Sequence, residues 1–487
     1  MRVLIVVPKA DFHLFSTFMP LGALAIGSYA RQQGHQVRIL DRNVEKTMLQ
    51  EVLRTFEPQV VGVSLISYLM IADALEVSRQ VRNIGLPVVW GGAMATHAAQ
   101  QAVEERAADY VVSSEGEITF CELLCALENN APMHNIKGLV FLDEQGSVCQ
   151  TPQREFAALS DFPSTDWTLI DPNKYVNSLY QYRRAVTWIA AKGCPNKCSF
   201  CANEFFNRSQ YRKRSMDHVM QEIQYLAQTL DVDMIRFCDE WFYPNKADLR
   251  EFCSRYRALN ISTKWFCFYV PGRLSREELQ MMYDSGCRGI VYGIDSGSPA
   301  VLKRMNKRID LDKAQQELVW CNEIGLFAQC AFIIGLPDET KDELRETVNV
   351  INKIHVHVIK VIRCFILIPG TAYYQQLSQQ GRVTPFARLE DWVSPSANEY
   401  FGGIKNYSNI PTKHLIVLQH YFQWQAFWNR KTNQSIAGGV IRSVIANITR
   451  DGLVTLFRSA WISAIVFLQH VWYRFAYPNI LREYELK

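Results

Sequence analysis

The stretch Gly193-Cys-Pro-Asn-Lys-Cys-Ser-Phe-Cys201 places three cysteines in a C-x3-C-x2-C spacing. Thiolates are the soft ligands that iron–sulfur clusters need, and three at this spacing can hold three irons of a four-iron, four-sulfur cluster. The fourth iron then lacks a protein ligand, and an open metal position is typical of catalytic sites. We therefore predict a [4Fe–4S] cluster on Cys194, Cys198 and Cys201, with a catalytic role.

Two other uses of cysteine fit this sequence less well than a cluster does. A zinc ribbon needs a second close pair, and a disulfide scaffold is typical of short secreted chains. The remaining cysteines of this chain are scattered, mostly within apolar patterns, where free cysteine acts as a small hydrophobic residue. The triplet therefore favours a cluster.

Length and charge indicate a large enzyme that does not bind nucleic acid. A chain of 487 residues exceeds one usual core, so two or three domains are expected. The net charge is only +4, too little asymmetry for nucleic-acid binding. Met1 and Arg2 run directly into an apolar stretch, which argues against a secretion signal. Unpaired cysteines and an oxygen-sensitive cluster predict a reducing cytoplasm.

Residues 1–150 are predicted to form an α/β domain. Apolar, mostly β-branched runs alternate with stretches of helical spacing, and these runs are expected to be strands at residues 3–7, 36–40, 60–64, 88–90 and 110–112. Strands buried on both faces and separated by helices imply a parallel, doubly wound, Rossmann-like sheet.

Ligands bind such sheets at the carboxyl ends of the strands. Small or polar residues follow three of the predicted strands, where glycine admits a flat ligand and serine offers hydrogen bonds. The candidate ligand-binding residues are Ser64, Ser67, Gly91, Gly92, Glu115, Gly116 and Glu117.

After a linker over residues 151–184, residues 185–390 repeat the alternation of strand and helix. Expected strands lie at residues 186–190, 234–238, 263–269, 289–294, 327–334 and 358–366. This order predicts a closed or partial (β/α) barrel whose active site lies at the carboxyl ends of the strands. The cysteine triplet would then follow the first barrel strand.

The triplet, with the aromatic Phe200 before its last cysteine, resembles the signature of radical S-adenosylmethionine (SAM) enzymes. Four later segments, in the family's order, resemble its strand-end motifs: 236–242, 292–298, 332–340 and 367–371. The resemblance implies that Asp239 or Glu240 binds the amino group of SAM. It also implies that Asp295, where the family has glutamate, and Ser296 lie near the SAM ribose and carboxylate.

The first domain resembles the cobalamin-binding domain of cobalamin-dependent radical SAM proteins. The resemblance rests on Pro20-Leu-Gly22, Val89-Trp-Gly-Gly-Ala93 and Asp109-Tyr-Val-Val-Ser-Ser-Glu-Gly-Glu117. Asp11-Phe-His13 follows the first strand at the place of the D-x-H-x-x-G motif, in which the histidine binds cobalt. Position 16 is serine rather than glycine. The resemblance thus implies cobalamin, with His13 as a candidate cobalt ligand beside an unligated alternative.

Residues 391–487 are rich in aromatic residues at helical spacing, which predicts amphipathic helices. Their longest apolar stretch, 460–468, is shorter than a membrane span of about 20 residues. The region either caps the barrel mouth or forms an interfacial surface that makes peripheral membrane contact. The second reading rests on three arginines beside three aromatic residues: Arg458, Arg474 and Arg482 with Trp461, Trp472 and Tyr473.

The family resemblance implies reductive cleavage of SAM to a 5'-deoxyadenosyl radical, with electrons from a donor such as flavodoxin or ferredoxin. Cobalamin would supply a methyl group to an unactivated carbon, or to phosphorus, of a small or lipid-like substrate. Two alternatives stay open: an oxidative cyclase without methyl transfer, like the anaerobic magnesium-protoporphyrin IX monomethyl ester cyclase, and a non-catalytic iron–sulfur or redox-sensing protein.

Overall fold

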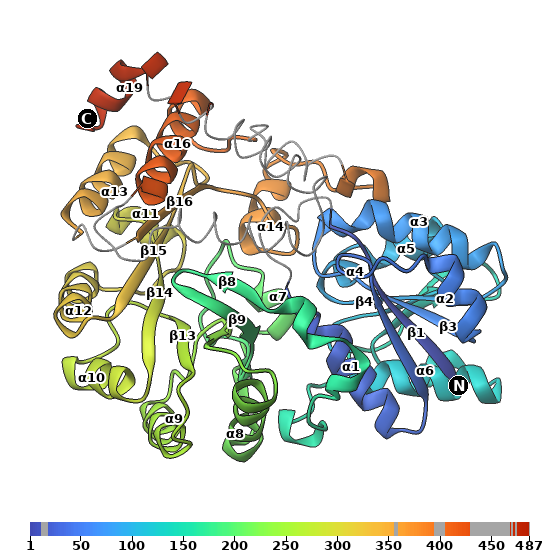
Figure 1. The fold of residues 1–487 in the computed structure, drawn as a ribbon. Helices are drawn as coiled ribbons and strands as arrows, with labels where there is room; N and C mark the ends of the chain where they lie inside the picture. The colour runs from blue at the N-terminus through green and yellow to red at the C-terminus, as the bar shows by residue number, and fades with distance from the viewer. Residues whose placement is uncertain are drawn as a thin grey trace. The chain divides into compact units, whose positions relative to one another are not determined.

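The computed structural model describes residues 1–10, 18–354, 359–393, 405–428, 468, 471–472 and 475–486. Contacts between these residues divide the chain into two compact units. The first contains residues 1–10, 18–175 and 377–393, and the second contains residues 176–376 and those from 405 onward, within the described ranges. Figure 1 shows both units as ribbons.

The first unit is built on a seven-stranded sheet with the order β2-β1-β3-β4-β5-β6-β7. Strands β1 to β5 are parallel, whereas β6 and β7 add an antiparallel hairpin. The bounds are β1 Arg2–Val7, β2 Gln36–Asp41, β3 Val60–Ser64, β4 Val88–Gly91, β5 Tyr110–Val112, β6 Leu139–Leu142 and β7 Val148–Gln150. All five predicted strands form, and their order is the doubly wound order that places ligands at the switch point.

Helices cover both faces of this sheet. They are α1 Leu21–Gln32, α2 Leu49–Phe56, α3 Ile71–Arg82, α4 Ala93–His97, α5 Ala99–Glu104 and α6 Glu117–Asn129. Helices α2 to α5 share one apolar core with the strands, while α1 and α6 contact each other. Apolar burial on both faces explains why the strands read as continuous hydrophobic runs. The doubly wound fold class is confirmed.

The first unit extends past residue 150 and includes a segment from far along the chain. The side chain of Tyr175 donates a hydrogen bond to Asp41 at 2.9 Å. Leu389 and Trp392 are buried in the same core as the helices after β3 and β4, and the backbone N–H of Leu389 donates to Glu105. Residues near 390, which the sequence analysis assigned to the barrel and the C-terminal region, thus belong to this unit by contact.

The second unit contains a seven-stranded sheet with the order β16-β15-β14-β13-β12-β9-β8. All neighbouring pairs are parallel except β8 with β9, and the sheet is open, so it forms a partial barrel. The bounds are β8 Asn177–Leu179, β9 Tyr182–Trp188, β12 Met234–Phe237, β13 Lys264–Tyr269, β14 Cys287–Asp295, β15 Phe327–Ile334 and β16 Ile359–Cys364. Six of these strands match the predicted barrel strands, and β8 was not predicted.

In Figure 1 helices α8, α9, α10 and α12 follow one side of this row of strands. The helices of this part of the chain are α7 Asn203–Asn207, α8 Met216–Gln224, α9 Lys246–Ala258, α10 Arg276–Asp284, α11 Pro299–Arg304, α12 Leu311–Ile324, α13 Lys341–Lys353, α14 Ala372–Gln379, α16 Thr412–Trp428 and α19 Pro478–Glu483. Along β15, residues 328, 330, 332 and 334 are buried and residues 329, 331 and 333 are less covered. The alternation shows that the helices cover one face of the sheet more fully than the other.

The edge strand β16 is covered by α16. Leu415 and Leu418 of this helix are fully buried, and the side chain of Gln419 accepts a hydrogen bond from the backbone N–H of Cys364 at 2.7 Å. An uncovered edge strand would present unpaired backbone groups. The C-terminal region therefore completes the sheet at its last strand.

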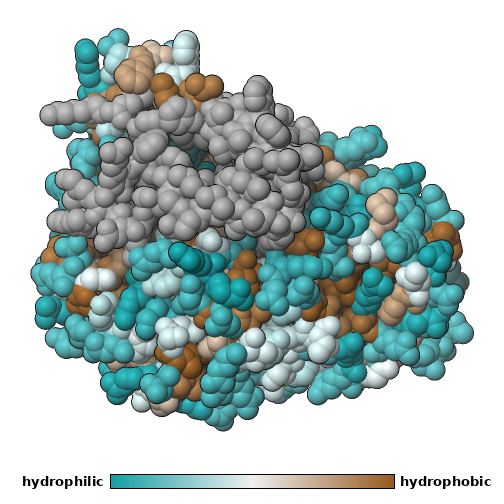
Figure 2. All heavy atoms as spheres, viewed as in Figure 1, coloured by the Kyte–Doolittle hydropathy of each residue, from teal (hydrophilic) through white to brown (hydrophobic). Residues whose placement is uncertain are grey.

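On the face that Figure 2 shows, the coloured residues are mainly hydrophilic, with hydrophobic patches between them. Within the described ranges, no helix combines the length and the apolar content that crossing a bilayer requires.

Candidate active site

The three cysteines lie on a loop that a short antiparallel pair of strands frames. Strand β10, Ala191–Lys192, precedes the loop and pairs with β11, Arg212–Lys213, which follows it. Gly193 has φ 85°, and a Cβ added there would lie 1.9 Å from the carbonyl oxygen of Gln210. Only glycine fits at this close approach.

Two side chains outside the triplet hold the loop by its backbone. The Asn203 side chain accepts from the N–H of Cys194 at 3.0 Å and donates to its carbonyl at 2.7 Å. Glu240 accepts from the N–H of Gly193 at 2.9 Å and from the Asn207 side chain at 3.1 Å. The loop conformation is thus fixed by hydrogen bonds to its backbone, and the three cysteines form no disulfide.

Asp239 and Glu240 both accept hydrogen bonds from backbone N–H groups. Asp239 is 2% exposed and accepts hydrogen bonds from the N–H groups of Ala190 at 3.1 Å and Ala191 at 2.6 Å. Burial raises the pKa of Asp239 to about 7. The carboxylates join the end of β12 to the start of the cysteine loop, and a contact with the SAM amino group stays a prediction for both.

The thiols share their surroundings with a buried ion pair. Lys307 Nζ lies 2.5 Å from Asp295 Oδ2, and both side chains are about one-tenth exposed. Burial raises the pKa of each thiol, that of Cys198 to about 11, while the Lys307 ammonium acts in the opposite direction on all three. The resemblance placed Asp295 near SAM, and the structure gives its carboxylate an ammonium partner.

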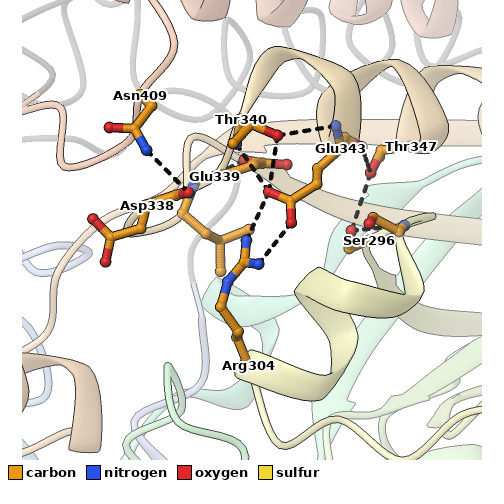
Figure 3. Close-up of polar contacts among 10 residues, drawn as sticks. Ser296, Arg304, Asp338, Glu339, Thr340, Glu343, Thr347 and Asn409 are labelled. Carbon is orange, nitrogen blue, oxygen red and sulfur yellow. Dashed lines mark hydrogen bonds and ion pairs between the residues drawn. The ribbon is translucent and has the colours of Figure 1, made fainter.

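Ser296 is fully buried, and its hydroxyl lies 3.0 Å from the hydroxyl of Thr347 in α13. The Ser296 hydroxyl also accepts from the N–H of Ser298. Figure 3 shows the contact between Ser296 and Thr347, and it also shows the bidentate ion pair between Arg304 and Glu343. The structure thus places the Ser296 side chain in the packing between α11 and α13, and its predicted contact with SAM stays a prediction.

The segment 335–340 forms the turn from β15 into α13. Glu339 is fully buried and accepts from the N–H groups of Gly335 at 2.6 Å and Leu336 at 3.1 Å, while Thr340 and Glu343 form a capping box. Asp338 adopts φ 62°, in the left-handed region that glycine and, less often, aspartate and asparagine adopt. The segment has the strand-to-helix architecture that the sequence indicates.

The donor set of the loop fits an iron–sulfur cluster. Thiolates are the soft ligands that such clusters take, and a cubane can bind one thiolate on each of three irons. The cysteine loop supplies three thiols that form no disulfide.

In the first unit, the predicted ligand-binding residues gather at the carboxyl edge of neighbouring strands. Ser64 ends β3 and Gly91 ends β4. Gly92 has φ 99°, and a Cβ added there would lie 2.5 Å from the carbonyl oxygen of Leu65, so a larger residue does not fit. Strands β3, β4 and β5 are adjacent. The sheet therefore brings the separate sequence motifs to one edge.

The turn after β5 presents a buried hydroxyl without a protein partner. Ser114 has φ 69°, and its Oγ has no hydrogen-bond partner among the described residues. A small pocket lies beside it, with Ser114, Glu115, Glu117 and Arg154 among its lining residues. An unsatisfied buried hydroxyl at this edge fits a polar ligand such as cobalamin. Ser67 instead caps a short helix by accepting from the N–H of Leu69.

Gly116 and Phe200 are two further residues that the sequence predicts to contact a cofactor. Gly116 precedes α6, and a Cβ there would lie 3.0 Å from Ile26. Phe200 is half-buried in the cysteine loop. The structure gives neither residue a polar role, and their assignment as cofactor contacts stays a prediction.

Several predicted residues lie outside the described ranges. They are Asp11, His13, Arg458, Trp461, Tyr473 and Arg474. The cobalt ligation by His13 and the interfacial surface of the C-terminal region stay predictions. Trp472 is described, with 64% of its surface exposed.

Sequence reasoning missed the residues that bond to the cysteine loop, to Asp295 and Ser296, or to the start of α13. Asn203, Lys307, Arg304 and Thr347 carry no motif of their own in a single sequence. One signal was available for Asn203, because an amide two residues after the last cysteine can bond back to the loop. Lys307 and Arg304 reach their partners only through the tertiary fold.

Comparison with known proteins matches each unit to a domain family. The Radical SAM superfamily matches residues 188–351, and the B12 binding domain matches residues 10–124. An uncharacterized methyltransferase, PH0819 of Pyrococcus horikoshii, is 27% identical over 367 residues, 73% of this chain and 79% of that protein. The anaerobic magnesium-protoporphyrin IX monomethyl ester cyclase of Rubrivivax gelatinosus is 24% identical over 362 residues, 71% of this chain and 65% of the cyclase.

The fold has a solved counterpart. The radical S-adenosylmethionine methyltransferase TsrM of Kitasatospora setae aligns with a TM-score of 0.65 at 21% identity, covering 78% of this chain and 75% of TsrM. This likeness shows a shared fold, and the two domain matches agree with the cofactor set predicted from the sequence. The chain thus contains a B12-binding domain and a radical SAM domain, and its cofactors are a [4Fe–4S] cluster, SAM and cobalamin.

Proposed function

We propose that this enzyme transfers a methyl group from SAM to an unactivated carbon of a small or lipid-like molecule, with phosphorus as a less common acceptor. One observation carries the proposal. The same chain holds the three-cysteine loop, residues 193–201, and a B12-binding domain whose candidate ligand-binding residues lie at the carboxyl ends of β3 to β5. The methyltransferase relative from Pyrococcus horikoshii, aligned over 73% of this chain, supports methyl transfer.

In this proposal the protein's own residues bind and orient the cofactors. Cys194, Cys198 and Cys201 supply three thiolates, which must lose their protons on binding. The groups at the carboxyl edge of β3 to β5 hold cobalamin, with the Ser114 hydroxyl as a hydrogen-bonding partner. When bound, the cluster supplies an electron that cleaves SAM, and cobalamin carries the methyl group.

The direct test is an anaerobic incubation of reconstituted enzyme with SAM labelled in its methyl group, cobalamin, a low-potential reductant and extract of the host cell. We expect a labelled product that is heavier by one methyl group, together with 5'-deoxyadenosine. Single changes of Cys194, Cys198 or Cys201 to alanine should abolish 5'-deoxyadenosine formation. An unchanged rate in any of these variants would refute the assignment.

A second candidate is an oxidative cyclase without methyl transfer. It is supported by the magnesium-protoporphyrin IX monomethyl ester cyclases, which are 24–29% identical to this chain and of which it covers 54–65%. The same incubation separates the two functions, because a cyclase yields 5'-deoxyadenosine with an unlabelled product. A redox sensor without turnover would yield no 5'-deoxyadenosine at all.

A further inference from the structure

The turn that follows α11 is fastened to the cysteine loop. The N–H of Ser199 donates to the carbonyl of Met305 at 2.8 Å, and the side chain of Asn306 donates to the carbonyl of Lys197 at 2.7 Å. Asn306 adopts φ 52°, which the tight turn requires. The next residue, Lys307, is therefore held at a fixed place relative to the three thiols.

Lys307 is a buried cation with one carboxylate partner. Its ammonium lies 2.5 Å from Asp295, with 11% of the lysine side chain and 9% of the aspartate side chain exposed. Gly293 leaves room beside this pair, since a Cβ there would lie 3.5 Å from both the ammonium and the carboxylate oxygens. Burial of both groups reduces screening by water, so the pair acts strongly on nearby charges.

Lys307 directly follows the two residues that touch the cysteine loop. Met305 and Asn306 bond to Ser199 and Lys197, which flank Cys198 on either side. Asp295 comes from the end of β14 and meets the ammonium at 2.5 Å. The lysine is thus tied to the loop through its own turn, and the aspartate holds its ammonium in place.

We propose that Lys307 sets the reduction potential of the cluster, with Asp295 as the positioning residue that holds the ammonium beside it. Reduction adds one electron, taken from a low-potential donor, to the oxidised cluster and makes it more negative by one charge. A fixed buried cation stabilises the more negative state, and the local charge is one determinant of cluster potentials. The inference rests on the proposed function only through its cluster.

The test is a redox titration of the reconstituted cluster, followed by electron paramagnetic resonance and without substrate. Lys307→Met should shift the midpoint potential to more negative values, because it removes the cation and leaves the carboxylate. Asp295→Asn should shift it to more positive values, because the amide oxygen still accepts a hydrogen bond from the Lys307 ammonium while the negative charge is removed. The double variant should lie between the two, and Lys307→Arg should stay near the parent.

Lys303→Met is the matched control, because it removes the same charge from an exposed position in α11, and it should leave the potential unchanged. Iron and sulfide content shows that each variant holds a complete cluster. If Lys307→Met fails to hold one, Asp295→Asn still decides, since an unchanged or more negative potential overturns the inference. Equal potentials in all variants overturn this inference alone, whereas a parent protein that binds no cluster overturns the proposed function as well.

Discussion

At the scale of single residues, the conformation of the cysteine loop depends on a position where an added Cβ atom does not fit. Gly193 is the clearest case, because both its φ of 85° and the Gln210 carbonyl exclude a side chain. Gly146 has a similar φ of 79° but nothing within 4 Å of an added Cβ. The two glycines therefore separate backbone strain from steric conflict.

We predict that Gly193→Ala lowers the iron content per protein after reconstitution several-fold, because the loop must move to relieve the contact. Gly146→Ala carries only the strain of a positive φ, about 1–2 kcal/mol, and should keep the parental iron content. Iron analysis and chemical unfolding measure the two effects. Equal iron content in both variants would contradict the steric argument.

Glu317 offers a residue-scale prediction on pH. It is 1% exposed and accepts hydrogen bonds from the N–H groups of Arg273 and Leu274. Burial raises its pKa to about 7. A carboxyl with a raised folded pKa binds more protons in the folded state, so its contribution to stability is full at low pH and is lost as pH rises to about 7.

Glu317→Gln keeps the acceptor and removes this titration. We expect the free energy of unfolding of the variant to fall less than that of the parent between pH 4.5 and pH 7, measured by urea unfolding at a series of pH values. Glu323→Gln on the same helix is the control, since Glu323 is exposed. Parallel pH profiles for parent and Glu317→Gln would show that the carboxyl titrates normally.

At the scale of elements, helix α16 protects the last strand of the partial barrel. The bond from the Cys364 N–H to Gln419 satisfies a backbone group at the sheet edge. Gln419→Leu leaves that donor unpaired, so we expect a loss of about 1–3 kcal/mol in the free energy of unfolding. Gln425→Leu in the same helix removes only a bond from Gln425 to the Tyr421 hydroxyl, so it should lower the free energy of unfolding by less. Urea unfolding of the two variants checks the difference.

At the scale of the whole molecule, the chain returns to its first unit after completing the barrel strands. Trp392 is 5% exposed in the core of the first unit, although more than 200 residues separate it from that unit's last strand. We predict that Trp392→Ala destabilises the first unit by about 3–5 kcal/mol and weakens cobalamin retention. Trp472→Ala, at a 64% exposed position, is the control. Cobalamin content after gel filtration and thermal unfolding should separate the two, and equal behaviour would contradict the packing.

Sequence alone determined the local features of this protein. The spacing of Cys194, Cys198 and Cys201 predicts the cluster ligands by their chemistry, and the alternation of apolar runs and helical periods predicts two mainly parallel sheets, because both signals are carried by neighbouring residues. The added strands β6, β7 and β8 were missed, since short antiparallel strands have weak patterns.

Only the tertiary structure decided which distant side chains support the site. It paired Lys307 with Asp295, turned Asp239 and Glu240 toward the backbone of the cysteine loop, and returned Trp392 to the first core. These contacts join residues from separate elements, so no periodicity or spacing encodes them. The physical reason is that burial and charge pairing depend on the packed fold, whereas ligand type and strand period are properties of the local sequence.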